Sequence, residues 1–254
     1  MFDLQANEDA APIERGEVAD AVAKIRAAAH WGDVAAQAIY ARMCCEGRGV
    51  ARDDAEGCHW YALAANSGHV EAMNMLGRCH ELGRGTPANA ELAAVWYRKA
   101  ALGGLDWGMY NYANMLATGR GVKPDRAAAV AWYRRAAEAG HAKSMNLLGR
   151  YYEEGWEVER DPAAALDWYR RAAHGGDFRG QASYAGVLAQ QGRIDEALQW
   201  LERALEAGTP SFLEKLGDEL ECAQQAQLCA IGTRMRAHAA AMISATLNES
   251  TGTR

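Results

Sequence analysis

The sequence predicts an all-α fold, a solenoid of stacked antiparallel helix pairs. The first observation is a Trp-Tyr dipeptide that recurs every 36 residues, at Trp60, Trp96, Trp132 and Trp168. The second is a glycine series with the same step, formed by Gly32, Gly68, Gly104, Gly140 and Gly176. A fixed step of about 20–50 residues is the signature of supersecondary units that stack. The chain is also rich in alanine and has only 5 prolines and 3 phenylalanines, which favours helix over strand.

In chain order, residues 1–15 are polar and without a period, and a flexible tail is expected there. Val18, Val22 and Ile25 then predict an amphipathic helix over about residues 17–29, half a repeat that caps the stack. The repeat solenoid is expected to cover residues 16–208, with this half-repeat, four 36-residue repeats and one shorter repeat. The first helices of the four full repeats are predicted at residues 34–45, 70–82, 106–118 and 142–154.

Glycine loops and N-cap residues predict where one helix ends and the next begins. Two glycines follow each of the first three of these helices, as at Gly83 and Gly85, because glycine ends a helix in the left-handed conformation at little cost. In the fourth repeat Glu157 replaces the second glycine, and Trp156 is expected to be exposed. Second helices start after side chains that accept hydrogen bonds from unpaired backbone N–H groups. These N-cap residues are Asp53, Asn89, Asp125 and Asp161.

The Trp-Tyr pairs are predicted to be structural, since each ring buries on the order of 150–250 Å². Cofactor stacking by four equally spaced indoles is the alternative interpretation. One alanine per repeat lets neighbouring helices approach closely. These alanines are Ala64, Ala100, Ala136, Ala172 and Ala204.

The end of the chain departs from the 36-residue step. The fifth repeat spans 32 residues, from Gly176 to Gly208, because a short turn replaces the glycine loop. Capping helices are expected within residues 209–247, with a break or kink at Gly232. Residues 248–254 are expected to form a second flexible tail.

The repeated string resembles the Sel-one-like repeat, a relative of the tetratricopeptide repeat. The residues that carry the resemblance are Met75-Leu76-Gly77 with Gly83 and Gly85, and Asp125 leading to Trp132-Tyr133, Ala136-Ala137 and Gly140. It covers about residues 17–208, and its fifth unit is similar to an ordinary tetratricopeptide repeat. The resemblance implies a right-handed superhelix of helix pairs and a role as an adaptor that binds other proteins. Some relatives are secreted and carry a regular disulfide in each repeat, but here Cys58 has no cysteine counterpart one repeat later, at Ala94.

Charge and composition exclude several classes of function. The formal net charge of −6 does not fit a nucleic-acid-binding surface. The first residues lack a signal-peptide pattern, and no apolar run reaches the length of about 18 residues that a membrane span needs. We therefore expect a cytoplasmic protein that contacts neither nucleic acid nor membrane. The six cysteines include no CxxC motif, and free, mostly buried thiols are expected.

No catalytic or metal-binding pattern accompanies the repeats. The chain has no Gly-x-Ser-x-Gly, Ser-x-x-Lys, Walker or His-Glu-x-x-His motif, so no enzymatic activity, catalytic residue or cofactor is expected. The Gly-Arg-Gly loops are interpreted as helix stops rather than phosphate cradles, because none follows a strand. His69 and His141 lie two repeats apart, and no metal site is expected.

In a superhelix of this kind the first helices line the concave face, where outward side chains are available for binding. The predicted partner-binding residues are two outward columns and an aromatic neighbour: Arg42, Asn74, Arg78, Trp107, Tyr110, Asn114, Asn146 and Arg150. Asn amides bond a peptide backbone and Arg forks hold carboxylates, which predicts an extended or helical segment, acidic or with a free C-terminus. The alternative is a solvated face in which Arg78 pairs with Glu81, and Arg150 with Glu153 or Glu154.

These observations predict a non-enzymatic scaffold or adaptor that binds a partner polypeptide in its groove, in bacterial signalling, secretion or stress response. An inhibitor or immunity-type protein that occludes one enzyme or toxin is the second hypothesis. A weak β-lactam-binding hydrolase, an activity suspected of secreted relatives, is the third. The oligomeric state is left open.

Overall fold

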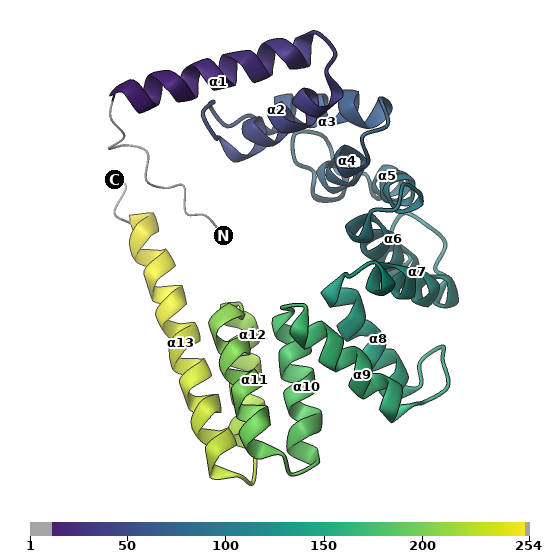
Figure 1. Ribbon diagram of the computed structural model, residues 1–254, viewed down its shortest axis with the longest axis vertical. Coiled ribbons are helices and arrows are strands. Elements are labelled where there is room, and N and C mark those ends of the chain that lie inside the picture. Colours follow the sequence, from purple (N-terminus) through teal and green to yellow (C-terminus); the bar gives the residue numbers. More distant parts are fainter. Residues whose placement is uncertain (1–11, 252–254) are drawn as a thin grey trace. The chain divides into compact units, whose positions relative to one another are not determined.

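The structure, a computed structural model, describes residues 12–251, with side chains described for residues 17–246. This part of the chain forms thirteen α-helices and no strand, as the sequence predicts (Figure 1). The helices of the N-terminal half are α1 (Pro12–His30), α2 (Val34–Glu46), α3 (Asp54–Asn66), α4 (Val70–Leu82), α5 (Ala90–Leu102) and α6 (Asp106–Thr118). The others are α7 (Arg126–Glu138), α8 (Ala142–Glu154), α9 (Pro162–His174), α10 (Phe178–Gln190), α11 (Ile194–Ala207), α12 (Pro210–Glu221) and α13 (Ala226–Thr251).

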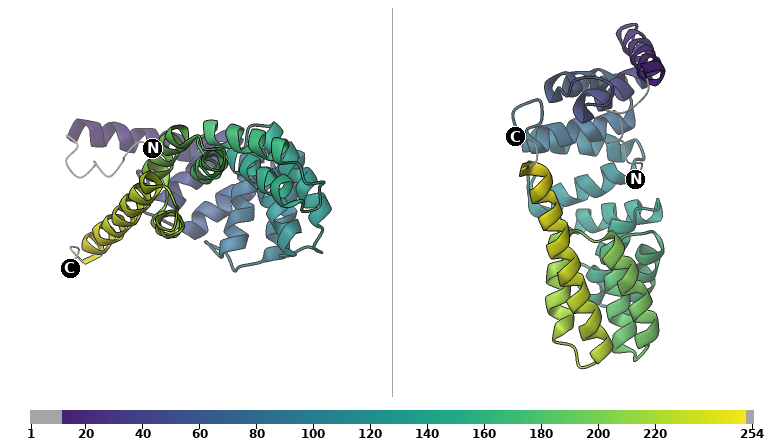
Figure 2. Two further views of the ribbon diagram at one scale, coloured as in Figure 1. Left: turned by 90° about the horizontal axis from the view of Figure 1, so that it is seen from below. Right: turned by 90° about the vertical axis from the view of Figure 1, so that its left-hand side faces the viewer.

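The chain divides within α7 into two compact units, residues 1–132 and 133–254. In the first unit α2 packs on α3 and α4 packs on α5, each pair being one repeat. In the second unit α8 packs on α9, α10 on α11 and α12 on α13. Figure 2 shows α13 running alongside α12. Each unit is therefore built from the helix pairs that the sequence predicts.

Helix ends confirm the predicted loop chemistry. The first helices α2, α4, α6 and α8 begin at the predicted residues, and α2 alone runs one residue beyond the predicted end. Each is closed by a glycine with a φ of 67–73°, the left-handed conformation. The predicted N-caps of the second helices also form, as at Asp53, whose carboxylate accepts from the backbone N–H groups of Ala55 and Glu56 at 2.9 Å. Asn89, Asp125 and Asp161 make the same kind of bond.

The tyrosine of each Trp-Tyr pair fills the core more completely than the tryptophan. Tyr61, Tyr97, Tyr133 and Tyr169 are 1–3% exposed. Among the indoles, Trp60 is buried, whereas Trp96, Trp132 and Trp168 are half-buried. The charged ends of two side chains lie over these indoles. Lys99 Nζ is 4.0 Å from the Trp96 ring centre, and Arg171 Cζ is 4.1 Å from that of Trp168.

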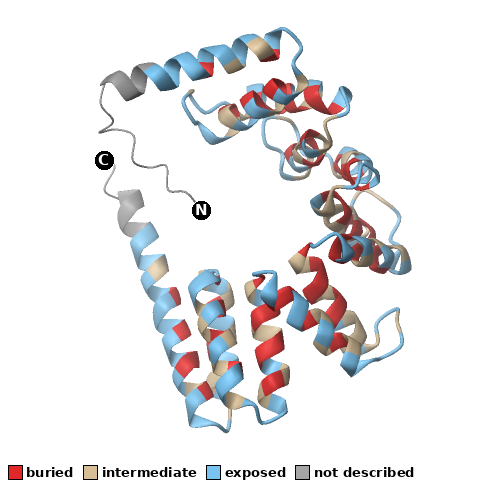
Figure 3. Cartoon of the chain, in the orientation of Figure 1, coloured by how far each residue is buried: buried red, intermediate tan, exposed pale blue. Residues whose placement is uncertain are grey.

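Small residues make room for these rings. A Cβ atom at Gly77 would lie 2.8 Å from the ring of Tyr97, and one at Gly149 would lie 2.5 Å from that of Tyr169. The predicted alanine series is fully buried as well, with Ala64, Ala100, Ala136, Ala172 and Ala204 all 0% exposed. Figure 3 shows the buried residues gathered on the inner faces of the helix pairs. The residues that recur in each repeat therefore serve helix packing: a tyrosine ring fills the space that a glycine or alanine of the neighbouring helix leaves open.

Three predictions about the chain ends are wrong. Helix α1 begins at Pro12, inside the stretch predicted as a tail, while residues 1–11 lie outside the described part. The break near the C-terminus falls at residues 222–225 and not at Gly232, which lies within α13. A Cβ atom at Gly232 would meet the carbonyl oxygen of Gly217 at 2.8 Å, so this glycine serves a close crossing of α12 and α13. Helix α13 also continues to Thr251, into the predicted second tail, and residues 252–254 are outside the described part.

Candidate functional site

The first helices of the N-terminal unit line a hollow of about 540 Å³, here named the first hollow. Its walls come from α2 and α4, and the start of α6 closes one end. Four of the predicted partner-binding residues line it: Arg42, Asn74, Arg78 and Trp107. Half of the eight candidate residues therefore line one cavity in the structure.

Arg42 and Arg78 are exposed in this hollow, and no ion pair holds either of them within the described residues. Glu81, the alternative partner foreseen for Arg78, is engaged elsewhere. It accepts from the Tyr97 hydroxyl at 2.6 Å and from Arg120 at 3.0 Å. Burial, with the bond to Glu81, raises the pKa of Tyr97 far above its usual value, so this hydroxyl remains a donor. The local Arg78–Glu81 pair is thus absent, and Arg78 is available to a partner.

Asn74 is not the outward-pointing side chain that the sequence predicts. It is only 7% exposed, and its Oδ1 accepts from Asn111 Nδ2 at 2.8 Å. This bond joins α4 to α6, so the asparagine column faces the first helix of the next repeat rather than solvent. Asn74 lines the hollow, and its Oδ1 atom already accepts a hydrogen bond from within the protein.

The first hollow has an apolar wall beside its arginines. Ile39 and Trp107 are 40% and 44% exposed, which is unusual for such large apolar side chains. The Trp107 ring packs edge-on against Tyr110, with ring centres 6.1 Å apart. Tyr110 and Asn114, also predicted to bind a partner, are half-buried and do not line the hollow.

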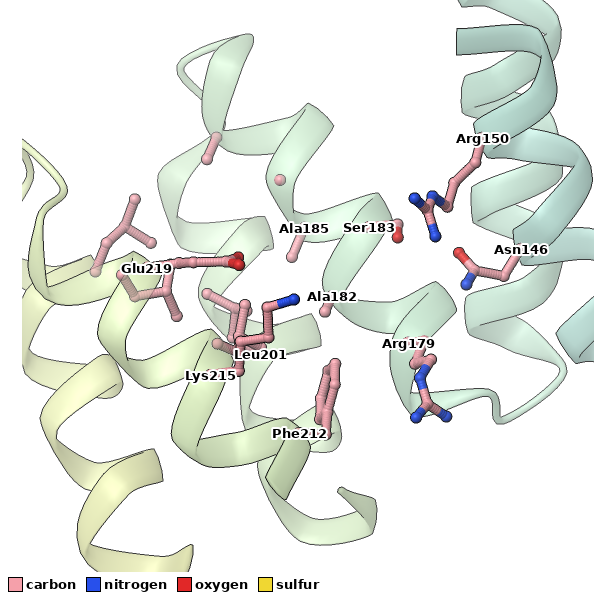
Figure 4. A pocket seen from close by; sticks show the side chains of 15 residues that line it. Asn146, Arg150, Arg179, Ala182, Ser183, Ala185, Leu201, Phe212, Lys215 and Glu219 are labelled. Carbon is pink, nitrogen blue, oxygen red and sulfur yellow. The ribbon is translucent and has the colours of Figure 1, made fainter. Parts of the chain in front are cut away.

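The second unit contains a hollow of its own, of about 500 Å³, here named the second hollow. It lies between α8, α10 and α12, and the two remaining predicted residues, Asn146 and Arg150, line it from α8 (Figure 4). Asn146 is buried like Asn74, again contrary to the outward orientation predicted. Sequence reasoning missed the opposite wall, which is formed by Arg179, Ser183, Phe212, Lys215 and Glu219.

No group of three or more His, Cys, Asp or Glu side chains in the described part of the chain is placed to hold a metal ion. His69 and His141 instead cap α4 and α8, where their Nδ1 atoms accept backbone N–H groups at 3.3 Å and 3.2 Å. All six cysteines lie in the described part as free thiols, with Cys44, Cys58 and Cys79 buried. None of the helices in that part combines the length and apolarity needed to cross a membrane.

A family model of the Sel1 repeat matches residues 34–69, 70–105, 108–141, 142–177 and 185–209. The chain belongs to the Sel1 repeat family. Sel1 repeats generally form non-catalytic scaffolds for protein–protein interaction, in agreement with the absence of a catalytic motif from the sequence. No curated protein matches the chain.

Several solved structures share this fold. A Sel1 repeat protein from Oxalobacter formigenes has 27% identity and a TM-score of 0.73, over 90% of this chain and 98% of that one. The protective antigen c5321 of uropathogenic Escherichia coli has 29% identity and a TM-score of 0.70, over 88% of this chain and 49% of that one. The immunity protein Pa5087 from Pseudomonas aeruginosa has 17% identity and a TM-score of 0.55, over 81% of this chain and 80% of that one.

Proposed function

We propose that this Sel1 repeat protein is an adaptor that binds a segment of a partner polypeptide along its first helices. The observation that carries the proposal is the first hollow. It sets two unpaired arginines, Arg42 and Arg78, beside two exposed apolar side chains, Ile39 and Trp107. A peptide with one apolar side chain next to a carboxylate matches both walls.

The arginines of the first hollow do not form a general anion site. Glu46 and Glu71 also line it, so its formal charge is balanced. Glu46 pairs with Arg48 at 2.9 Å, and Glu71 lies 3.3 Å from His69, which leaves Arg42 and Arg78 without a carboxylate of their own. A balanced wall of this kind favours a specific segment over an arbitrary polyanion.

An inhibitor or immunity-type protein would use the same surface on a single enzyme or toxin. The likeness to Pa5087 stands at 17% identity and speaks for a shared fold alone. The two hypotheses differ in the stoichiometry of the bound partner, and one experiment covers both.

The test is affinity capture from the native lysate with the full chain, followed by quantitative mass spectrometry. The variant is Arg42→Gln with Arg78→Gln, which removes two charges and keeps most of each stem. The matched control is Arg84→Gln with Arg98→Gln, two exposed arginines outside the hollow. We expect the partners to be lost about tenfold or more with the first pair and retained with the second.

Several partners below stoichiometric yield support an adaptor, and one tight stoichiometric partner supports an inhibitor. Equal capture by wild type and by the Arg42 and Arg78 variant, with both proteins folded, would contradict the proposed site.

A further inference from the structure

We propose that the second hollow binds a carboxylate of an acidic polypeptide segment. Arg150, Arg179 and Lys215 provide its cationic contacts, and Asn146 receives a hydrogen bond from the segment's backbone. This inference rests on the proposed function, that first-helix faces bind polypeptide, and adds a second site with a different chemistry.

The charge of the second hollow is the first argument. Three cationic side chains line it, Arg150, Arg179 and Lys215, against the one carboxylate of Glu219. This excess of positive charge stands out in a chain whose formal net charge is −6. No ion pair within the described residues engages any of the three cations. Their charged groups therefore remain available to a ligand, although Arg179 also interacts electrostatically with the buried Asp177 carboxyl.

Two of the cations are held in place by aromatic rings. Arg179 Cζ lies 4.7 Å from the ring centre of Phe178 and 5.7 Å from that of Phe212. Arg150 Cζ lies 5.6 Å from the ring centre of Trp156, which is 47% exposed. A guanidinium that already rests on a ring loses less freedom when it binds an anion, so these contacts favour binding.

An orphaned amide oxygen is the second, independent argument. Asn146 is 5% exposed, and its buried Oδ1 accepts no hydrogen bond. In the first unit the equivalent oxygen of Asn74 is satisfied by Asn111. Two repeats after Asn111 the sequence has Ser183, whose side chain is shorter and leaves Asn146 without its donor. A buried acceptor without a partner costs free energy, which a peptide N–H entering the hollow would recover.

The arrangement of these groups suits one short stretch of peptide. Figure 4 shows Asn146 and Arg150 reaching from α8 toward Ser183 on α10, while Lys215 extends from α12 on the other side. Phe212 supplies an apolar surface below them. A volume of about 500 Å³ is enough for one or two side chains.

A carboxylate fits this wall better than a phosphate does. Glu219 stands in the same hollow and would repel a doubly charged phosphate more strongly than a singly charged carboxylate. The carboxylate can belong to an Asp or Glu side chain or to a free C-terminus, and the experiment distinguishes these sources.

The test begins with a random dodecapeptide library, displayed with free carboxyl ends and selected on the full wild-type chain. Each enriched peptide is synthesised with a fluorophore, and its affinity is measured by fluorescence polarisation. The variant for the second hollow is Arg179→Gln with Lys215→Gln. The matched control is Arg171→Gln with Arg203→Gln, two arginines that also rest on aromatic rings but lie outside the hollow.

We expect one class of peptides to bind the Arg179 and Lys215 variant at least tenfold more weakly and to bind the control normally. Their affinity should fall to the same extent when their Asp and Glu become Asn and Gln, or, for a terminal carboxylate, when the end is amidated. Phosphorylation of these peptides should not be required.

A further variant tests the amide contact. Ser183→Asn restores the residue of the first unit and should let its side chain donate to Asn146 Oδ1. We expect a higher melting temperature together with an affinity about threefold to tenfold lower for this peptide class. Ser244→Asn, on the exposed face of α13, is the control and should change neither.

The outcomes separate this inference from the proposed function. The inference would be overturned if every selected peptide bound the Arg179 and Lys215 variant as tightly as the wild type, or bound equally well without its carboxylates. The proposed adaptor function would remain in either case. Selection that yields no binding peptide at all would overturn both. An unchanged melting temperature and affinity for Ser183→Asn would refute the role of Asn146.

Discussion

The two hollows use the same first-helix register with different side chains. Asn74 and Asn146 are 72 residues apart, which is two repeats, and both lie buried at the floor of a cavity. At the same step, however, Trp107 of the first unit corresponds to Arg179 of the second. The first hollow is consequently apolar with a balanced charge, and the second is cationic. Function in a repeat protein can thus change at a few register positions while the backbone is retained.

The helix packing near the two hollows shares two contacts. Tyr97 donates to Glu81 and Tyr169 donates to Glu153, both at 2.6 Å. Each tyrosine also packs on a glycine of the first helix. The differences between the hollows therefore arise in the side chains that face the cavities and in the wall that α12 adds to the second hollow.

The largest expected effect tests whether the two units are indeed equivalent in their cores. Tyr97→Ala and Tyr169→Ala should each lower the free energy of unfolding by about 3–5 kcal/mol, because each removes a buried ring and leaves a cavity. Tyr97→Phe and Tyr169→Phe keep the ring and should cost only about 1 kcal/mol, for the lost bond to the glutamate. Urea unfolding followed by circular dichroism measures all four. Losses for the two alanine variants that differ by more than about 2 kcal/mol would break the comparison.

The next effect concerns the hydrogen bond from Asn111 to Asn74, which has no counterpart at Asn146 in the second unit. Asn111→Ser gives the first unit the residue of the second and leaves Asn74 Oδ1 without its donor. We expect a loss of about 1–3 kcal/mol, the cost of an unsatisfied buried acceptor. Asn66→Ser, an exposed position at the end of α3, should stay within about 0.5 kcal/mol of wild type in the same urea titration. Equal stability of both variants would mean that Asn74 finds another donor.

The local chemistry of the repeats was readable from the sequence. The helix stops at glycine and the N-caps at Asp53, Asn89, Asp125 and Asp161 depend on neighbours within a few residues, and all of them form. The alanine series was readable for the same reason, since its period is that of the repeat. The role of Gly232 was predicted wrongly because the sequence does not show which helix packs against it. Without that helix, a glycine that allows a close helix crossing cannot be distinguished from one that ends a helix.

The candidate site was readable only in part. Arg42, Arg78 and Arg150 line hollows, and their role in binding a partner stays a prediction. Asn74 and Asn146 are buried rather than turned outward, because their neighbours lie in the following repeat. The wall formed by α12 was missed altogether. The fifth repeat spans 32 residues instead of 36, so the side chains of α12 cannot be aligned with those of the earlier first helices by a constant 36-residue step. The exchanges of Trp107 for Arg179 and of Asn111 for Ser183, each two repeats apart, were signals that sequence comparison within the chain could have used.

The smallest expected effect lies in the loops, where the units also differ. The second loop glycine of the first unit, as at Gly85 and Gly121, has a φ of 68–69°. In the second unit Glu157 takes this position with a φ of 54°, the one non-glycine residue with positive φ in the described part of the chain. Glu157→Gly should raise the free energy of unfolding by up to about 1 kcal/mol, because relief from the left-handed conformation outweighs the added freedom of the unfolded chain. Glu159→Gly, two residues further along the same loop, lacks this strain and should be neutral or slightly destabilising in the same urea titration. A gain of equal size from both would show that the removed charge, and not the backbone conformation, is responsible.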